Sequence, residues 1–318
     1  MLTSHRRMRA IALFAFVALA AVACGDSDGP TPAGGQSTAS TAAPDPNRTL
    51  KISAIPDQDP AKLVTINGTM ATYLATTLGR KVEYVPVTDY AASVSLFKTG
   101  DLDMVFFGGL TGVQARLQTP GSTLVAQRDV DDAFQSIFIA NTSAGVKPVT
   151  DVKGLTALKG KRFSFGSESS TSGRLMPEYF LDQAGMSSEK DFSGPPGYSG
   201  SHDKTIDLVT SGTYEAGALN LQVWKTRLVA GTIDLTKVGE VFTTPSYRDY
   251  HWIAGPKTNE RFGAGFTDQV KAALLALDVN DAEQAKLLTL YGAKKFIATE
   301  AANYTQIESI GRKLKLIS

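Results

Sequence analysis

Short strand-like segments alternate with longer helix-like segments over residues 49–318, and this order limits the folds that the chain can adopt. The first strand is predicted over residues 50–55. A helix with an apolar face follows over residues 61–78 and ends at Gly79. Further strands are predicted at 81–87, 102–107, 134–140 and 249–254, and further helices at 90–98, 268–277, 281–291 and 301–314. Such alternation predicts an α/β fold with helices on both faces of a mostly parallel sheet.

Two of the predicted strands are expected to carry the chain between two lobes. The segment near Phe134 leads out of the first lobe, and the segment near Tyr250 leads back into it. We therefore expect lobe one to consist of residues 49–136 and 249–318, and lobe two of residues 137–248. A body of this length can hold two domains of modest size.

The first 23 residues have the composition of a secretory signal peptide. Arg6, Arg7 and Arg9 precede an uninterrupted apolar run from Ala10 to Ala23, which is too short for a membrane-spanning helix. We therefore expect residues 1–23 to be a signal peptide and the protein to be exported.

Cys24 follows the apolar run directly and is the only cysteine in the sequence. The small residues before it resemble a bacterial lipobox, in which this cysteine is acylated and becomes the mature N-terminus. Lipidation of Cys24 predicts an anchor at the outer face of a bacterial cytoplasmic membrane. Release into the periplasm is the alternative, because Ala21 occupies the position where a larger aliphatic residue is usual.

Residues 24–48 are predicted to form a disordered tether. The stretch from Gly25 to Arg48 contains no aliphatic residue larger than alanine. Such a segment cannot bury enough apolar surface to fold. We expect it to connect the lipid anchor with a folded body that begins at Thr49.

The composition excludes several classes of function. Only His202 and His251 remain after loss of the signal peptide, and no cysteine follows Cys24, so neither a metal site nor a cofactor is expected. The chain has 32 basic and 31 acidic residues, and removal of the three signal-peptide arginines leaves 29 basic residues. A nearly neutral protein has no basic face for nucleic acid. Any bound anion must therefore be held by local dipoles and hydrogen bonds.

The strand-like segment 161–165 runs into a series of hydroxyl residues and then into an amphipathic helix. Amide groups at the start of a helix lack partners within it, and the helix dipole favours a negative charge there. The hydroxyls of Ser170, Thr171 and Ser172 can donate to the same anion. The pattern predicts an oxyanion site, and a serine-rich N-cap without a ligand is the alternative.

His202 lies where a second loop enters a helix. A helix N-terminus lowers the pKa of a nearby histidine, so we expect a neutral imidazole at the mouth of the site that donates through one nitrogen. A polar cap on the surface is the alternative. Further along, Gly217 and Ala218 permit close backbone approach before Asn220 and Gln222.

Several motifs in a fixed order carry a family resemblance. They are Asp89-Tyr90, residues 100–103 followed by Phe107-Gly108, residues 170–173 with Pro177, residues 200–202, and residues 217–220. In this order, over residues 50–316, the sequence resembles the substrate-binding proteins of phosphate, phosphite and phosphonate ABC importers. The resemblance implies a two-lobed type II periplasmic-binding fold, with a mixed, mostly parallel sheet in each lobe and two crossover strands.

The resemblance also implies which residues contact the ligand. Residues that match the family's hydrogen-bond donors to a tetrahedral anion are Tyr90, Ser170, Thr171, Ser172 and His202. Phe107 stands where phosphonate binders have a second tyrosine, so one donor is missing. Gln222 stands where a glutamate pairs with the ammonium group of aminoalkyl phosphonates, which weakens the prediction of a zwitterionic ligand.

Residues 55–60 together with residues 169–173 are similar to a branch of this family that is associated with selenate uptake. A small symmetric oxyanion is compatible with both differences from the family, namely Phe107 in place of a tyrosine and Gln222 in place of a glutamate. Arg128, Tyr247 or Tyr250 are predicted to complete such a pocket, and Gln58 to lie at its rim. For Arg128 a surface ion pair with a neighbouring aspartate is the alternative.

The sequence therefore predicts a monomeric substrate-binding lipoprotein of an ABC importer, and no enzyme. It is expected to capture a tetrahedral oxyanion between its lobes and to deliver it to the permease. A serine hydrolase that uses Ser170 and His202 is one alternative, although no G-x-S-x-G motif surrounds the serine. A sensor that signals to a membrane kinase is the other.

Overall fold

The computed structural model describes residues 45 and 47–317. The predicted signal peptide, Cys24 and most of the predicted tether over residues 24–48 lie outside the described residues. No helix in the described part of the chain is long and apolar enough to cross a membrane.

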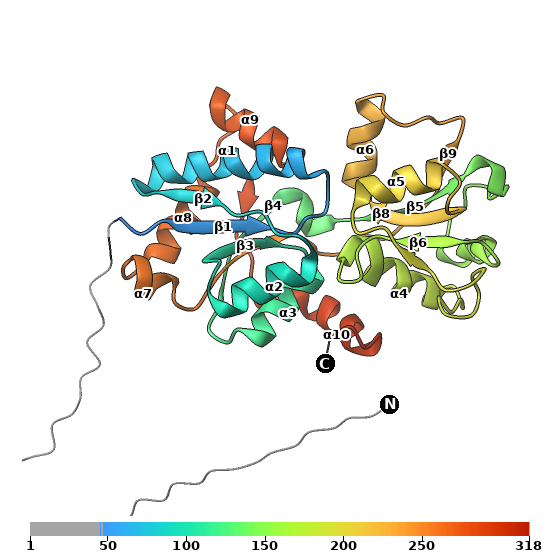
Figure 1. Ribbon diagram of the computed structural model, residues 1–318, viewed down its shortest axis with the longest axis horizontal. Coiled ribbons are helices and arrows are strands. Elements are labelled where there is room, and N and C mark those ends of the chain that lie inside the picture. The colour runs from blue at the N-terminus through green and yellow to red at the C-terminus, as the bar shows by residue number, and fades with distance from the viewer. Residues whose placement is uncertain (1–44, 46, 318) are drawn as a thin grey trace, which may run out of the picture. The chain divides into compact units, whose positions relative to one another are not determined.

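The first lobe is built on a six-stranded sheet with the order β11-β4-β10-β3-β1-β2 (Figure 1). Strand β1 is parallel to β2 and β3, whereas β10 is antiparallel to β3 and β4, and β11 to β4. The strands are β1 (Leu50–Ala54), β2 (Val82–Tyr84), β3 (Met104–Phe107), β4 (Thr123–Arg128), β10 (His251–Ala254) and β11 (Phe296–Ile297).

Helices cover both faces of this first sheet (Figure 1). Helix α1 contacts α8 and α9 on one face, and α2, α3 and α10 form a contiguous group on the other. The helices are α1 (Pro60–Leu78), α2 (Tyr90–Thr99), α3 (Gly109–Gln118), α7 (Thr258–Phe262), α8 (Phe266–Leu275), α9 (Ala282–Leu290) and α10 (Thr305–Lys313).

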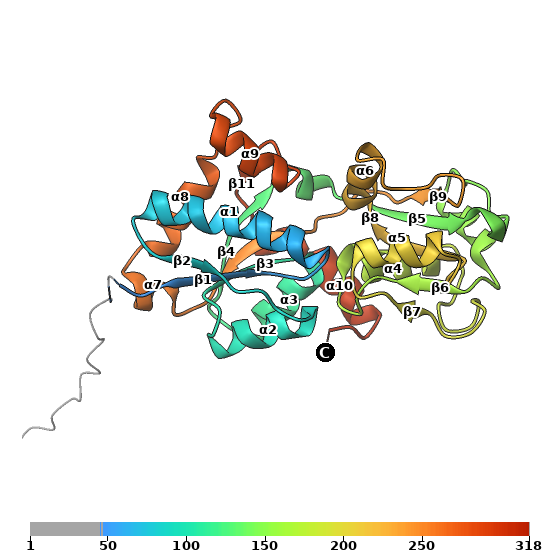
Figure 2. The same ribbon diagram turned by 45° about the horizontal axis from the view of Figure 1, so that its top comes forward.

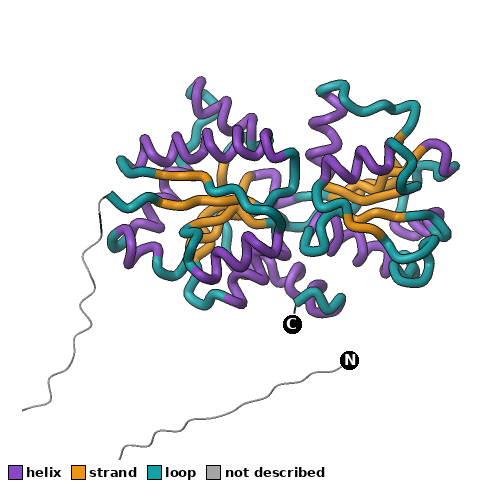
Figure 3. Tube along the Cα trace, in the orientation of Figure 1, coloured by secondary structure: helices purple, strands orange, loops and turns teal. Residues whose placement is uncertain are grey.

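The second lobe is built on a five-stranded sheet with the order β7-β6-β8-β5-β9, and the tube in Figure 3 shows the two groups of strands. Strand β6 is parallel to β7 and β8, and β5 is antiparallel to β8 and β9. The elements are β5 (Ser136–Asn141), β6 (Phe163–Phe165), α4 (Met176–Gln183), β7 (Gly197–Tyr198), α5 (His202–Thr210), β8 (Ala216–Asn220), α6 (Leu221–Val229) and β9 (Val238–Thr243).

Two connections join the sheets, one between β4 and β5 and one between β9 and β10. They pair with each other, because the amide of Phe134 donates to Tyr247 O at 2.7 Å and the amide of Tyr247 donates to Phe134 O at 2.9 Å. Strands β5 and β10, which adjoin the connections, run antiparallel to both of their neighbours. The α/β two-sheet fold confirms the predicted fold class, although antiparallel pairs are more frequent than predicted. The exact lobe boundaries remain a prediction.

Helix boundaries follow the local sequence closely. The Asp59 side chain caps α1 by accepting from the amides of Ala61 and Lys62, and Gly79 ends the helix with a φ of 59°. A left-handed residue at this position strongly favours glycine. The predicted end of this helix at Gly79 is therefore confirmed.

Candidate functional site

Most helices that follow a strand begin at or beside a residue of the predicted site. Tyr90 is the first residue of α2, His202 of α5, and Asn220 is the N-cap of α6. Figure 2 shows the starts of α1, α5 and α6 where the two lobes meet. Ligands of α/β proteins commonly bind at the carboxyl ends of strands, where amides of helix N-termini lack partners. The fold thus directs several helix dipoles into one region.

The hydroxyl segment forms one tight turn after β6. Ser170 is its N-cap, and Ser170 Oγ accepts from the amide of Gly173 at 2.9 Å. Residues Thr171–Leu175 form a single π-helical turn before α4, a geometry that is frequent at functional sites. The three predicted hydroxyl residues are at most 3 % exposed. The turn is therefore part of the interior and is not a surface cap.

Thr171 connects the two lobes. Its Oγ1 accepts from the amide of Leu110 at 2.9 Å, and its hydroxyl lowers the pKa of the Asp249 carboxyl group. Asp249 Oδ1 in turn accepts from the amide of Gly109 at 2.8 Å. A Cβ on Gly108 would lie 3.2 Å from Thr171 Oγ1, a tight contact, so the close approach of the lobes favours a glycine here.

Three buried polar atoms of this region have no hydrogen-bond partner among the described residues: Tyr90 Oη, Ser172 Oγ and Asp249 Oδ2. Tyr90 and Asp249 belong to the first lobe and Ser172 to the second. A buried polar group without a partner costs free energy, so such atoms call for a ligand or ordered water. We call Tyr90, the turn Ser170–Ser172 and Asp249 the cradle.

Burial raises the pKa of Asp249 from its ordinary value of 3.8 to about 7, although the Gly109 amide and the Thr171 hydroxyl lower it. Sequence reasoning missed this residue. Its position as the first residue of the predicted strand 249–254 was the only local signal, because its burial depends on distant segments.

His202 is the first residue of α5 and is wholly buried, so the predicted alternative of a polar cap on the surface is wrong. Its Nδ1 lies 3.4 Å from the amide of Asn220, and its Nε2 lies 3.4 Å from Tyr250 Oη. Burial lowers the pKa of His202 to about 3, so the ring is neutral, as predicted, but burial is the cause rather than the helix N-terminus. Neither ring nitrogen contacts a serine, which removes the geometric basis for a serine hydrolase.

Asp57 is a second buried carboxylate that the sequence did not reveal. Tyr250 Oη donates to Asp57 Oδ2 at 2.7 Å, and the amide of His202 donates to Asp57 O at 2.9 Å. Burial raises the pKa of Asp57 to about 6 against the lowering effects of Tyr250 and Arg128. The predicted rim residue Gln58 instead accepts from Lys62 Nζ at 2.5 Å and faces a neighbouring cavity.

Arg128 is buried, so the predicted alternative of a surface ion pair is wrong. Its guanidinium donates twice to Asp131 at 2.7 Å and once to Tyr291 O at 2.7 Å. The guanidinium carbon lies 4.8 Å from the centre of the Tyr250 ring. Arg128 thus supports Tyr250 and is not brought to the cradle.

Two other predicted residues have different positions relative to the cradle. Phe107 is wholly buried and packs edge-on against Phe97, with ring centres 5.4 Å apart, so it belongs to the core of the first lobe. Tyr247 lies beside the cradle, because its hydroxyl is 2.6 Å from Ser136 Oγ, which donates to Ser172 O at 2.8 Å.

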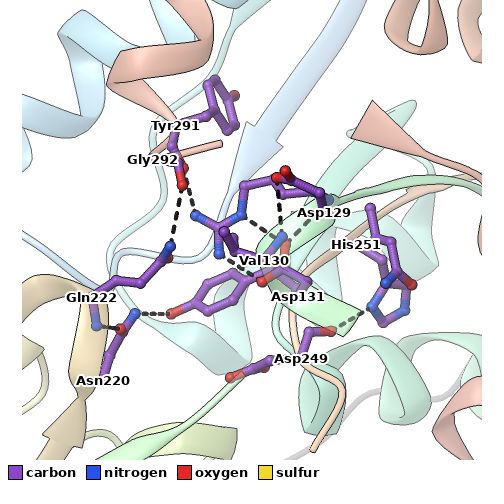
Figure 4. Close-up of polar contacts among 12 residues, drawn as sticks. Asp129, Val130, Asp131, Asn220, Gln222, Asp249, His251, Tyr291 and Gly292 are labelled. Atoms are coloured by element: carbon purple, nitrogen blue, oxygen red, sulfur yellow. Dashed lines mark hydrogen bonds and ion pairs between the residues drawn. The ribbon is translucent and has the colours of Figure 1, made fainter. Parts of the chain in front are cut away.

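Asn220 and Gln222 lie at the contact between the lobes (Figure 4). Asn220 Nδ2 is 3.4 Å from Tyr250 Oη, and Gln222 Nε2 donates to Gly292 O at 3.2 Å. Both line a cavity of about 440 Å³ that Asp57 and Tyr250 also line. No group of three potential ligands suited to a metal ion occurs within residues 47–317.

Known proteins that are similar in sequence to this chain belong to one family of transporter components. Residues 52–304 match the family described as "ABC transporter, phosphonate, periplasmic substrate-binding protein". The chain is 48% identical over 271 residues to "Probable ABC transporter phosphite binding protein PhnD1" of Prochlorococcus marinus, covering 85% of this chain and 91% of the relative. It is 29% identical over 278 residues to "Phosphate-import protein PhnD" of Mycolicibacterium smegmatis, covering 84% and 80% of the two chains.

Solved structures show the same fold. PhnD1 from Prochlorococcus marinus in complex with methylphosphonate has a TM-score of 0.83 at 47% identity, over 86% of this chain and 100% of that chain. A binding protein component of an ABC phosphonate transporter from Pseudomonas aeruginosa has a TM-score of 0.73 at 16% identity, over 85% and 87% of the two chains.

These relatives are transporter components that bind ligands, so the protein is a binding protein and not an enzyme, as predicted. It is exported, because the family acts in the periplasm. The chain belongs to the family of periplasmic substrate-binding proteins of phosphonate ABC transporters.

Proposed function

We propose that the protein binds a small tetrahedral phosphorus oxyanion, such as phosphite or methylphosphonate, in the cradle. The observation that carries the proposal is the presence of three buried polar atoms without a hydrogen-bond partner on segments of both lobes that meet at Thr171. Two are hydroxyls that can donate, and one is a carboxylate oxygen that can accept. This set matches an anion that has bare oxygens and one protonated oxygen.

The bare oxygens are bound by hydroxyl and amide groups. Tyr90 and Ser172 donate directly, and the helix starts beside them add the positive ends of their dipoles. Micromolar affinity needs about 8 kcal/mol, and hydrogen bonds to a charged group supply about 1.5–3 kcal/mol each. A few such bonds are therefore sufficient, even after the cost of closing the lobes.

The Asp249 carboxylate favours an oxyanion that carries a proton. A phosphorus oxyanion near neutral pH can donate this proton to the ionised form of Asp249, whereas sulfate and selenate have none to donate and bind only to the protonated form, at a free-energy cost that grows as the pH rises above the Asp249 pKa of about 7. Selenate, which the sequence resemblance suggested, is therefore less favoured than phosphite. The 48% identical relative is named for phosphite binding, and the structure of a 47% identical relative contains methylphosphonate, which supports the same ligand class.

The contacts between the lobes correspond to a closed form that can present its ligand to a permease. The amide of Asp59 donates to Asp203 Oδ2 at 3.0 Å, and Lys313 Nζ lies 2.7 Å from Asp182 Oδ2. An anion that contacts both lobes only when they are closed stabilises the closed form. The stabilisation equals the difference between the anion's binding free energies for the closed and the open form. Cys24 is proposed to carry the lipid anchor, residues 24–48 to form the tether, and the protein to act as a monomer.

A thermal-shift panel on the protein without residues 1–24 tests the proposal. A ligand that binds only the folded state raises the melting temperature in proportion to RT ln(1 + [L]/Kd). We expect phosphite, methylphosphonate and phosphate, each of which can carry a proton near neutral pH, to stabilise the protein, and sulfate and selenate to stabilise it little. Equal stabilisation by selenate would contradict the role of Asp249.

A further inference from the structure

His251 is a buried ionisable residue to which the proposed function gives no role. It is the first residue of β10, two positions after the cradle residue Asp249 (Figure 4). Burial lowers the pKa of His251 to about 3, so the ring is neutral and carries one hydrogen. Its Nδ1 lies 3.1 Å from Asp249 O, a carbonyl oxygen that can only accept, so Nδ1 donates this hydrogen. The ring thus holds the main chain of Asp249.

The other ring nitrogen of His251 faces helix α3. It has no hydrogen-bond partner among residues 47–317. A Cβ added to Gly112 of α3 would lie 2.5 Å from His251 Nε2 and would overlap Cε1, so the ring packs directly against the helix backbone. The Tyr304 ring also packs against the imidazole, with ring centres 3.9 Å apart, and Tyr304 Oη donates to Gln127 Oε1 at 3.1 Å. These contacts fix the ring between its neighbours.

The first turn of α3 meets the same part of the chain at two further positions. A Cβ on Gly108 would lie 3.3 Å from Asp249 Oδ1, and a Cβ on Gly109 would lie 3.2 Å from the carbonyl oxygen that precedes Asp249. Gly108 has no side chain that could cap the helix, and the Asp249 carboxylate accepts from the amide of Gly109 instead. The position of α3 and the orientation of the Asp249 carboxylate are therefore linked.

We infer that His251 is a positioning residue for the oxyanion site. Its Nδ1 holds the main chain of Asp249, and its ring sets the distance to α3, so that the Gly109 amide binds Asp249 Oδ1 and Oδ2 stays free for the ligand. The inference rests on the proposed binding of the oxyanion by Asp249. If His251 acted by packing alone, a side chain of similar shape without a donor would serve equally well.

Two double variants separate positioning from packing. Asparagine keeps a donor where His251 has Nδ1 and lacks the two ring atoms next to Gly112, and leucine has a similar shape without a donor. In both variants Gly112→Ala fills space that the ring leaves. We expect Gly112→Ala/His251→Asn to bind methylphosphonate about 5-fold more tightly than Gly112→Ala/His251→Leu, the equivalent of one hydrogen bond. Isothermal titration calorimetry measures both affinities.

The leucine variant should also lose part of the preference for phosphite over sulfate, because the orientation of Asp249 Oδ2 is no longer fixed. Gly112→Ala alone should weaken methylphosphonate binding about 10-fold, because the added methyl group displaces the ring. His251→Asn in the same chain should recover most of this loss. Gly68→Ala is the matched control, because a Cβ there would have no atom within 4 Å, and it should not change the affinity.

Equal affinity of the two double variants, or normal binding by Gly112→Ala, would overturn the positioning role while the parent protein still binds methylphosphonate. Where a double variant does not fold, the single variants His251→Asn and His251→Leu give the same comparison. Absence of methylphosphonate binding by the parent protein would instead overturn the proposed function.

Discussion

Tyr90 carries a hydroxyl that is buried without a partner among residues 47–317, so its removal should affect stability and binding in opposite directions. We expect Tyr90→Phe and Ser172→Ala each to weaken oxyanion binding about 10- to 100-fold, the equivalent of one charge-assisted hydrogen bond. The melting temperature without ligand should stay constant or rise, because an unsatisfied polar group is removed. Titration calorimetry and thermal melts measure the two effects.

Tyr73→Phe is the matched control for this pair. Its hydroxyl donates to Ala273 O at 2.7 Å and is remote from the cradle. This variant should lower the melting temperature and leave the affinity unchanged. A Tyr90→Phe protein that is less stable without ligand but binds normally would show that the Tyr90 hydroxyl serves the fold alone.

Asp249 gives a pH prediction at the same scale. Burial raises its pKa from 3.8 to about 7, so the folded protein holds this proton more tightly than the unfolded chain. Its contribution to stability is therefore full below pH 3.8 and is lost as the pH rises to about 7. Between pH 3.8 and about 7 the titration of Asp249 lowers the free energy of unfolding by up to about 1.4 kcal/mol per pH unit. Asp249→Asn should remove this dependence on pH. Melts of the ligand-free protein across this range measure it.

Asp132→Asn serves as the comparison for the pH series. Asp132 is exposed and pairs with Arg248 at 2.6 Å. Surface substitutions of this kind change stability little. If the unfolding free energy of Asp249→Asn depends on pH as it does in the parent protein, the titrating proton does not belong to Asp249.

At the scale of elements, the start of α3 determines how closely the lobes approach. A Cβ on Gly108 would lie 3.3 Å from Asp249 Oδ1 and 3.2 Å from Thr171 Oγ1. Because the φ of Gly108 is −74°, alanine fits the backbone and only the contact is affected. We expect Gly108→Ala to weaken ligand binding at least about 10-fold through a less closed form, with small change in ligand-free stability. Calorimetry and thermal melts test both statements.

Gly68 in α1 provides the control for that substitution, because an added Cβ there would have no atom within 4 Å. Gly68→Ala should stabilise the helix by about 0.5–1 kcal/mol and leave the affinity unchanged. Normal binding by Gly108→Ala would show that the approach of α3 to Thr171 is not needed for function.

The elements that the sequence predicted best are those with local signals. The strand and hydroxyl turn before α4 depend on residues within one short segment, and so does the end of α1 at Gly79. Asp57 and Asp249 could not be predicted as buried, because their environment is created by tertiary packing. Tyr250, which binds Asp57, is 193 residues away in the sequence. The predicted alternative for Arg128, a surface ion pair, is wrong for the same reason, because the nearby acidic residues gave no sign of its burial.

At the scale of the molecule, Thr171 links lobe two to α3, because its Oγ1 accepts from the amide of Leu110. Thr171→Val keeps the shape of the side chain and removes this bond. We expect both lobes to stay folded, with a ligand-free melting temperature lowered by loss of about 1 kcal/mol. Small-angle scattering at saturating methylphosphonate should show a larger radius of gyration than the parent protein. Identical scattering in both proteins would exclude a role of this residue in closure.

A crystal structure of the protein with methylphosphonate shows whether a phosphorus oxyanion fills the space between Tyr90, Ser172 and Asp249. We expect phosphonate oxygens at about 2.5–3.0 Å from Tyr90 Oη, Ser172 Oγ and Asp249 Oδ2. A phosphonate group seated in the cavity of about 440 Å³, with these three atoms still unpaired, would contradict the proposed function.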